Sequence, residues 1–349
     1  MRSTRFSVLD RSLVRQGQPP AQALRDTVRF AQQIEDLGYH RFWVSEHHSV
    51  PGVAGSAPTV LAAAVASATA TIRVGTGGVM LPNHQPLVVA EQFGVLESLF
   101  PGRIDLGLGR SVGFTDGIRR ALGRDKAAAE QFGTQVAELL GYFTGDQRSH
   151  PGVHAVPAEG LSPEVFVLAT GAGADHAAVL GLPLVIAAVG DEPRMLRLID
   201  QYRDRFRPGP WSAQPYVVVS TSVALADTAE RAWRMLLPEA WSTVYSRTHG
   251  VFPPLLPAGE VLASPMTGRE RELLDGAVRG QVHGTESAVA AALDGLISRS
   301  GADEVLVTLS TFDQQERLES YRRLASLLPE LPGPQPPSRL ALDTRPGVR

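Results

Sequence analysis

The chain has 349 residues, of which 43% are hydrophobic, so one large domain or two ordinary domains with a sizeable core can form. It has no cysteine, which excludes disulfides, thiolate metal sites and a cysteine nucleophile. The net charge of −3 comes from interspersed acids and bases, so no nucleic-acid-binding face is expected. Since the sequence has neither a membrane-spanning apolar run nor a signal-peptide pattern, it predicts a soluble, cytoplasmic protein with no membrane contact.

Strand-like and helix-like stretches alternate along most of the chain. Period-two or continuous apolar runs predict the strands, and apolar residues at helical spacing predict the helices between them. The predicted strands are 5–10, 41–47, 72–80, 103–111, 165–170, 184–189, 216–225 and 305–310, and the predicted helices are 21–37, 58–69, 86–99, 124–143, 174–180, 192–206, 227–237 and 314–327. Eight such units predict an α/β fold, a closed (β/α)8 TIM barrel, with a doubly wound open sheet as the alternative.

Two stretches interrupt this pattern. Residues 241–280, between the seventh and eighth predicted strands, are rich in Pro, Gly, Arg and Glu, and are interpreted as a long insertion that forms a lid. Residues 331–349 contain several prolines and are interpreted as a flexible tail. The barrel itself is therefore expected to occupy residues 1–330.

Active sites of such barrels lie at the carboxyl ends of the strands. In the predicted strand 103–111, Gly107 and Gly109 leave one face almost without side chains, which favours a flat ligand or a close backbone approach. Arg110 then stands at the strand end, where its planar guanidinium can hold a phosphate. The stretch Thr170–Gly173 opens a predicted helix and resembles a small phosphate cradle. The alternative is that these glycines only relieve crowding and that Arg110 is a surface cation.

Two histidines follow the second predicted strand. His47 and His48 face opposite ways if the strand continues through them, so only one can point into the barrel. A metal site would need a third ligand, such as Glu46 or His84. Because Glu46 lies on the opposite face from His47, the three do not converge and no metal site is predicted. A packed, hydrogen-bonded histidine is the alternative to a catalytic one.

Taken together, these strand ends resemble those of the bacterial luciferase-like monooxygenases, a family of flavin-dependent (β/α)8 enzymes. The stretches that carry the resemblance are 38–48, 72–82, 100–110 and 181–183, and the resemblance extends from about Phe6 to Leu328. The alkanal-monooxygenase-like branch, met in bacterial metabolism and in antibiotic biosynthesis, is the most similar one. Light emission does not follow from this resemblance.

The resemblance implies a mechanism and partners. Reduced FMN would be supplied by a separate, transiently bound flavin reductase, and O2 would react with it to give a flavin peroxide that oxygenates an organic substrate. Trp241, Phe252 and Leu255 in the predicted lid suggest that this substrate is hydrophobic or aromatic. A homodimer would form through the predicted helices 58–69 and 86–99.

The resemblance also assigns site residues. His47 would act in proton transfer, and the bond between Gly77 and Gly78 would be cis beneath the flavin ring. The residues that would bind the cofactor are Gly77, Gly78, Met80, Gly109, Arg110, Ala169, Thr170, Gly171, Ala172 and Gly173.

The chain departs from bacterial luciferase at several of these positions. Gly109 stands where luciferase has a reactive cysteine, Gly171 and Ala174 replace a serine and a threonine of the phosphate loop, and Glu130 stands near a phosphate arginine. Fewer side chains are therefore expected to contact the phosphate. Three alternatives stay open: a deazaflavin-dependent hydride-transfer enzyme on the same barrel, a non-catalytic flavin-binding subunit, and a metal hydrolase that uses His47 and His48.

Overall fold

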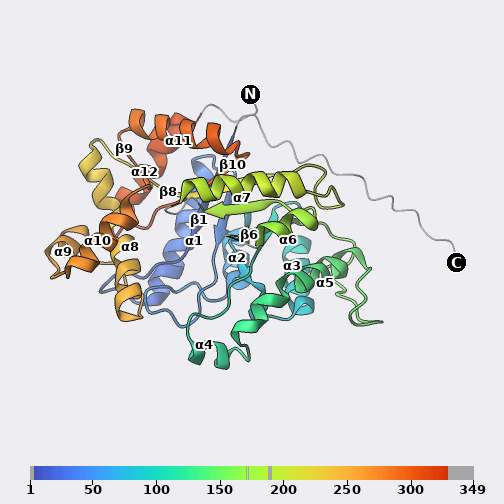
Figure 1. The fold of residues 1–349 in the computed structure, drawn as a ribbon. Helices are drawn as coiled ribbons and strands as arrows, with labels where there is room; N and C mark the ends of the chain where they lie inside the picture. Colours follow the sequence, from blue (N-terminus) through green and yellow to red (C-terminus); the bar gives the residue numbers. More distant parts are fainter. Residues whose placement is uncertain (1–3, 170, 172, 188–190, 329–349) are drawn as a thin grey trace.

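Eight parallel strands close into a barrel in the computed structural model, which describes residues 4–169, 171, 173–187 and 191–328 (Figure 1). The last of these strands pairs with both the first and the seventh, which closes the sheet. The predicted TIM barrel is therefore confirmed, and the open-sheet alternative is wrong. The barrel strands are β1 (Arg5–Asp10), β2 (Arg41–Val44), β3 (Arg73–Thr76), β5 (Ile104–Gly109), β6 (Glu164–Ala169), β7 (Leu184–Ala187), β8 (Val217–Leu225) and β10 (Glu304–Thr308).

Helices surround the barrel, and two short strands, β4 (Val79–Met80) and β9 (Val282–Gly284), extend it. Among the described residues, none of the helices combines the length and apolar character needed to cross a bilayer. The helices are α1 (Pro20–Asp36), α2 (Pro58–Ala68), η1 (Leu81–Asn83), α3 (Pro86–Leu99), α4 (Asp116–Ala121), η2 (Lys126–Gln131), α5 (Phe132–Thr144), α6 (Gly173–Val179), α7 (Glu192–Arg205), α8 (Ala229–His249), α9 (Ala258–Ala263), α10 (Gly268–Val278), α11 (Glu286–Ser300) and α12 (Gln314–Leu327).

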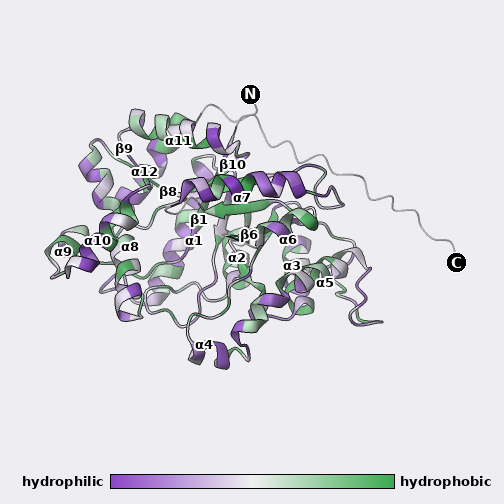
Figure 2. Cartoon of the chain, in the orientation of Figure 1, coloured by the Kyte–Doolittle hydropathy of each residue, from purple (hydrophilic) through white to green (hydrophobic). Residues whose placement is uncertain are grey.

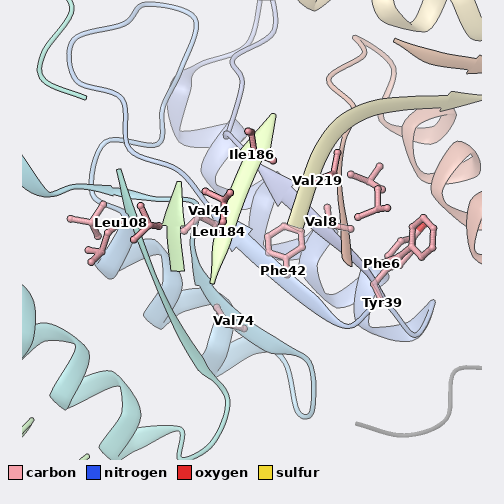
Figure 3. Close-up of a cluster of buried hydrophobic side chains, with 14 of the residues drawn as sticks. Phe6, Val8, Tyr39, Phe42, Val44, Val74, Leu108, Leu184, Ile186 and Val219 are labelled. Carbon is pink, nitrogen blue, oxygen red and sulfur yellow. The ribbon is translucent and has the colours of Figure 1, made fainter. Parts of the chain in front are cut away.

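Most of the core lies between the strands and the surrounding helices. Every second strand residue points outward into this layer, as the period-two pattern predicts, and Val8, Phe42, Val74 and Leu108 are fully buried there (Figure 3). The strands are mainly hydrophobic, whereas outer helices such as α4 and α7 carry many hydrophilic residues (Figure 2). Burial of the apolar strand faces is therefore the main force that holds the helices on the barrel.

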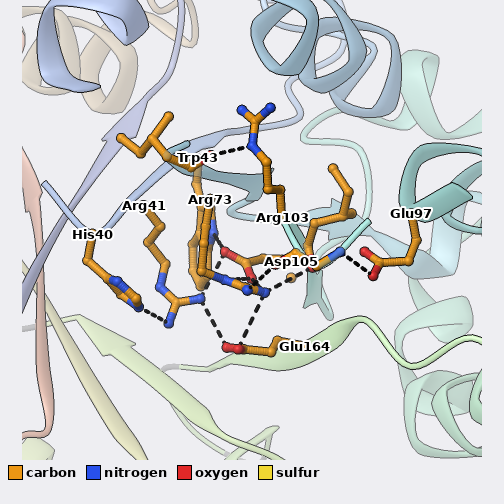
Figure 4. A network of polar contacts seen from close by, with 12 residues as sticks. His40, Arg41, Trp43, Arg73, Glu97, Arg103, Asp105 and Glu164 are labelled. Atoms are coloured by element: carbon orange, nitrogen blue, oxygen red, sulfur yellow. Dashed lines mark hydrogen bonds and ion pairs between the residues drawn. The ribbon is translucent and has the colours of Figure 1, made fainter. Parts of the chain in front are cut away.

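A buried ionic network fills the amino-terminal end of the barrel interior (Figure 4). The Arg41 guanidinium lies 2.8 Å from Asp105 and 2.9 Å from Glu304, and Arg73 lies 2.6 Å from Asp105. The Trp43 indole N–H also donates to Asp105, at 2.9 Å. Because these charges are mutually paired and hydrogen-bonded, their burial is compensated.

The next layer of the interior is apolar and buried. Trp43 and Phe166 meet edge to face with ring centroids 4.9 Å apart, and Val185, Val218 and Leu306 complete this layer. The space for a ligand therefore lies above these side chains, at the carboxyl ends, where such barrels carry their sites.

The segment 241–280 forms helices, although the sequence predicts a long loop there. Helix α8 continues through Pro238 to His249 and ends at Gly250, which adopts a left-handed conformation with φ of 77°. Helix α9 follows, and α10 begins with a capping box between Thr267 and Glu270. Figure 1 shows α8, α9 and α10 together at one side of the barrel.

Two other predicted elements are divided in the structure. The predicted helix 124–143 is continuous only from Phe132, because Asp125 caps the separate turn η2 by accepting from the Ala128 N–H. The predicted strand 72–80 is interrupted at Gly77 and Gly78, which separate β3 from β4. The predicted tail 331–349 lies outside the described residues.

Candidate active site

Gly107 and Gly109 of β5 were expected to leave one strand face open, and the bond between Gly77 and Gly78 to lie beneath a flat ring. A Cβ at Gly107 would collide with the carbonyl oxygen of Thr76, and one at Gly77 would lie 2.8 Å from Leu9 Cδ1. A Cβ at Gly78 would lie 2.7 Å from the carbonyl oxygen of Gly107. A glycine is needed at these three positions because backbone and side chains already fill the space that a Cβ would take.

Open space begins at the end of β5. A Cβ at Gly109 would meet nothing closer than the Val79 carbonyl oxygen at 3.7 Å. The adjacent Arg110 is half-buried, and its Nε donates to the Ala129 carbonyl oxygen at 2.9 Å. Its two terminal nitrogens have no hydrogen-bond partner among the described residues. This arrangement holds the guanidinium in place and leaves its outer nitrogens able to bind an anion.

The predicted phosphate loop follows β6. Gly109 pairs with Leu168, which places Arg110 beside the start of this loop. Ala169 and Gly171 are half-buried. Gly173 begins α6, and a larger residue would not fit at this position, because its Cβ would lie 2.8 Å from the Cβ of Ala169. Two further predicted residues of the loop, Thr170 and Ala172, lie outside the described residues.

The bond between Gly77 and Gly78 is cis, as predicted. Met80 follows it in β4, is buried, and donates its backbone N–H to Glu46 Oε2 at 2.9 Å. The structure thus brings Gly77, Gly78 and Met80 to the same strand end as Gly109, with which Met80 pairs.

His47 is half-buried at the mouth of the barrel. Its backbone N–H donates to Gly55 at 2.8 Å, and its Nδ1 lies 3.2 Å from the Ser45 hydroxyl. Burial, reinforced by the positive charge of Arg11, lowers the pKa of His47 to about 4. The imidazole is therefore neutral at pH 7 and has a lone pair with which to accept a proton.

Glu46, His48 and His84 form a polar cluster that sequence reasoning assembled only in part. The Glu46 Oε1 atom accepts hydrogen bonds from His48 Nε2 at 2.6 Å and from His84 Nε2 at 2.8 Å. Burial would raise the pKa of Glu46, but the hydrogen bonds from His84, Met80 and His48 hold it below its usual value. The cluster therefore ties the end of β2 to the segment that follows β4.

This cluster also bears on the prediction that the histidines after β2 form no metal site. His47 is not one of its members. The expected continuation of the strand through the two histidines is wrong, because β2 ends at Val44. The ligand atoms of Glu46, His48 and His84 do converge to within 4.8 Å of one another. Sequence reasoning missed this convergence because His84 is brought in by η1, a turn that carries no periodic signal.

Two residues beside the site carried no sequence signal. Phe114, on the loop after β5, is 62% exposed and stacks on His47 with ring centroids 6.1 Å apart. Arg194, near the start of α7, has its Nη2 atom 3.9 Å from the position a Cβ would take at Gly171. Phe114 lies on a loop without a periodic pattern. Arg194 lies in a predicted helix, but helical periodicity does not show which other segment its side chain approaches, so only the folded chain reveals these neighbours.

Of the three apolar residues expected to line the site from 241–280, only Phe252 is partly exposed. Trp241 and Leu255 are buried in the protein, and Leu255 forms a β-bridge with Arg15. The Phe252 carbonyl oxygen accepts from the Gly52 N–H at 2.9 Å. These contacts attach the segment to the barrel. The exposed aromatic side chain that stacks on His47 is instead Phe114, from the loop after β5.

A closed parallel barrel with its polar side chains gathered at the carboxyl ends of the strands defines the class of TIM-barrel enzymes. The sequence profile of the luciferase-like monooxygenase family matches residues 4–304. The chain belongs to this family. It is 34% identical to a luciferase-like monooxygenase of Escherichia coli over 94% of this chain and 98% of the relative.

Other comparisons agree with this membership. The structure of apo-MsnO8 has a TM-score of 0.83 and 32% identity, over 93% of this chain and 98% of that one. An N-acetyl-S-alkylcysteine monooxygenase of Bacillus subtilis is 36% identical over 65% of this chain and 70% of its own. The same fold recurs in 3,6-diketocamphane monooxygenase of Pseudomonas putida in complex with FMN, at 18% identity and a TM-score of 0.71, over 95% of this chain and all of that one. It also recurs in an F420-dependent secondary alcohol dehydrogenase, at 14% identity and a TM-score of 0.67, over 94% of this chain and all of that one.

Proposed function

We propose that this protein is the oxygenating component of a two-component monooxygenase. It would take reduced FMN from a separate flavin reductase and use O2 to oxygenate a hydrophobic or aromatic organic molecule. The observation that carries this proposal is Arg110, which follows the open end of β5 and whose Nε is anchored to Ala129, while its outer nitrogens have no hydrogen-bond partner among the described residues. A phosphate there would be bound through two charge-assisted hydrogen bonds.

Each group of residues then has a role in holding the flavin. Arg110 and the loop that contains Gly171 would bind the phosphate, and the ring would lie over Gly77–Gly78 and Met80. The bound flavin supplies the oxygen chemistry, while the protein binds, orients and shields it. His47, neutral at pH 7, would accept a proton at its free ring nitrogen.

The same site suggests the chemical class of the substrate and the segment that closes over it as a lid. Phe114 offers an exposed aromatic face next to His47, which favours an apolar or aromatic molecule. The segment 241–280 is proposed to act as the lid, because α8 reaches the mouth through the ion pair between Glu239 and Arg11. The name of the Bacillus subtilis relative makes N-acetyl-S-alkylcysteines the first compounds to test.

The test is aerobic turnover with chemically or enzymatically reduced FMN. We expect mass spectrometry to find products that gain one oxygen atom, and to find the heavy isotope in them when ¹⁸O2 is supplied. The His47→Ala variant should bind flavin normally and turn over about 10²–10⁴-fold more slowly. Absence of oxygenated product across apolar, aromatic and thioether substrates would contradict the proposal.

The deazaflavin alternative is tested in parallel. Anaerobic turnover with F420, and no turnover with reduced FMN and O2, would make the protein a hydride-transfer enzyme instead. Stoichiometric zinc in the purified protein, bound by Glu46, His48 and His84, would support the metal-hydrolase alternative. Tight flavin binding without any turnover would support a non-catalytic subunit.

We further propose that the protein is a cytoplasmic homodimer that pairs through α2 and α3. These helices expose Val60 at 69%, Val88 at 44%, Val95 at 47% and Leu99 at 65%. Apolar side chains gathered on two neighbouring helices are typical of a surface that a partner covers. A two-fold axis would set the same pair of helices from each copy against each other.

A further inference from the structure

We infer that Arg194 is a second cation of the flavin phosphate site and acts together with Arg110. This inference rests on the proposed function, since it assigns a residue to the cofactor that the proposal names. It concerns the recognition of the phosphate rather than of the ring. Sequence reasoning expected fewer side-chain contacts to the phosphate, and Arg194 would supply one of those that are lacking.

The strand order places the two arginines on either side of the phosphate loop. Strands β5, β6 and β7 are consecutive neighbours in the barrel. Arg110 follows β5, the loop with Gly171 follows β6, and Arg194 lies in the first turn of the helix after β7. The Arg194 Nη2 atom, at 3.9 Å, is the nearest group to the space beside Gly171 that a side chain would otherwise occupy.

The acidic residues around Arg194 are already engaged elsewhere. Asp191 caps α7 by accepting from the Arg194 backbone N–H at 3.0 Å. Glu192 pairs with Arg299 at 2.5 Å, and Asp175 pairs with Arg205 at 2.7 Å. The Arg194 side chain is exposed, and its guanidinium has no carboxylate partner among the described residues.

The charge of the ligand explains the need for a second arginine. A phosphate monoester carries a charge of about −2 at neutral pH, so Arg110 alone would leave about half of it uncompensated. The loop offers no hydroxyl at Gly171 or at Ala174, and Ala174 is buried. A guanidinium that approaches from α7 can replace those missing donors with two parallel hydrogen bonds.

Titration of the purified protein with FMN and with riboflavin, which lacks the phosphate, tests the inference. We expect Arg194→Ala to weaken FMN binding by at least about tenfold and to leave riboflavin binding unchanged. Arg194→Lys should bind FMN more tightly than Arg194→Ala but less tightly than the wild type. Added salt should reduce the difference in FMN affinity between the wild type and Arg194→Ala. Arg197→Ala is the matched control, because Arg197 is exposed one turn further along α7 and should not affect FMN binding.

The outcomes separate this inference from the proposed function. If the wild type prefers FMN to riboflavin and Arg194→Ala keeps that preference, Arg194 is not in the phosphate site and the proposed function stands. Equal loss of FMN and riboflavin binding in Arg194→Ala would also overturn the inference. If the wild type itself shows no preference for FMN, the phosphate site and the proposed cofactor fail together.

Discussion

His47 should make the folded protein less stable as the pH falls from 6.5 to 4. The unfolded chain takes up a proton at this residue near pH 6.5, whereas the folded protein, in which the pKa of His47 is about 4, does not. Stability is therefore lost as the pH drops through this window and is fully present above it. The linkage relation for these two pKa values gives a loss of about 2 kcal/mol at pH 5.

Urea unfolding of the wild type and of His47→Gln at pH 7 and pH 5 measures this contribution. The glutamine does not titrate, so the variant should lose about 2 kcal/mol less than the wild type between the two pH values. Burial lowers the pKa of His40 to about 2, but His40 is present in both proteins and its effect cancels. Equal losses in the two proteins would refute the claim that the folded structure keeps His47 neutral.

Three further experiments test the site, the barrel and the assembly. Arg110→Ala should weaken FMN binding by about 1.5–3 kcal/mol, and equal affinity by flavin fluorescence would remove it from the phosphate site. Gly107→Ala should destabilise the protein by about 1–3 kcal/mol in urea, because its Cβ would collide with the backbone of β3, whereas Gly109→Ala should change stability little. Light scattering at micromolar concentration should show a dimer that Val60→Glu with Leu99→Glu dissociates, and a monomeric wild type would contradict the proposed interface.

The fold could be predicted almost completely because its signals are local and repeated. Branched apolar residues at every second position specify strands that are covered on one side by helices, and Val8, Val74 and Leu108 lie in that layer as expected. The predictions failed where tertiary contacts override local preference. Proline normally ends a helix, yet Pro238 lies inside α8, where the helix is kept by the burial of residues such as Trp241 and Val244.

The site could be predicted only where a residue's position along a strand determines where it points. Arg110 could be placed at the rim of the barrel because it follows a strand directly, whereas strand alternation does not orient His47 and His48, because β2 ends at Val44. Phe114 and Arg194 were missed because a loop and a helix start bring them in from other parts of the chain. The prediction of the hydrogen-bond partners of Glu46 was likewise incomplete, because the sequence does not show how η1 brings His84 back toward β2.

The glycines show why a pattern of residues does not by itself define a binding space. Gly107 and Gly109 have the same place in the alternation of β5, but the backbone of β3 fills the space beside Gly107, whereas the nearest group to a Cβ at Gly109 would be 3.7 Å away. The difference arises because the Thr76 carbonyl oxygen of β3 stands directly beside Gly107, whereas β4, which pairs with Gly109, comes no closer than the Val79 carbonyl oxygen. Since Trp43 and Phe166 fill the interior below, we expect the proposed flavin ring to lie above Gly107. The proposed flavin site is therefore confined to the rim that carries Arg110.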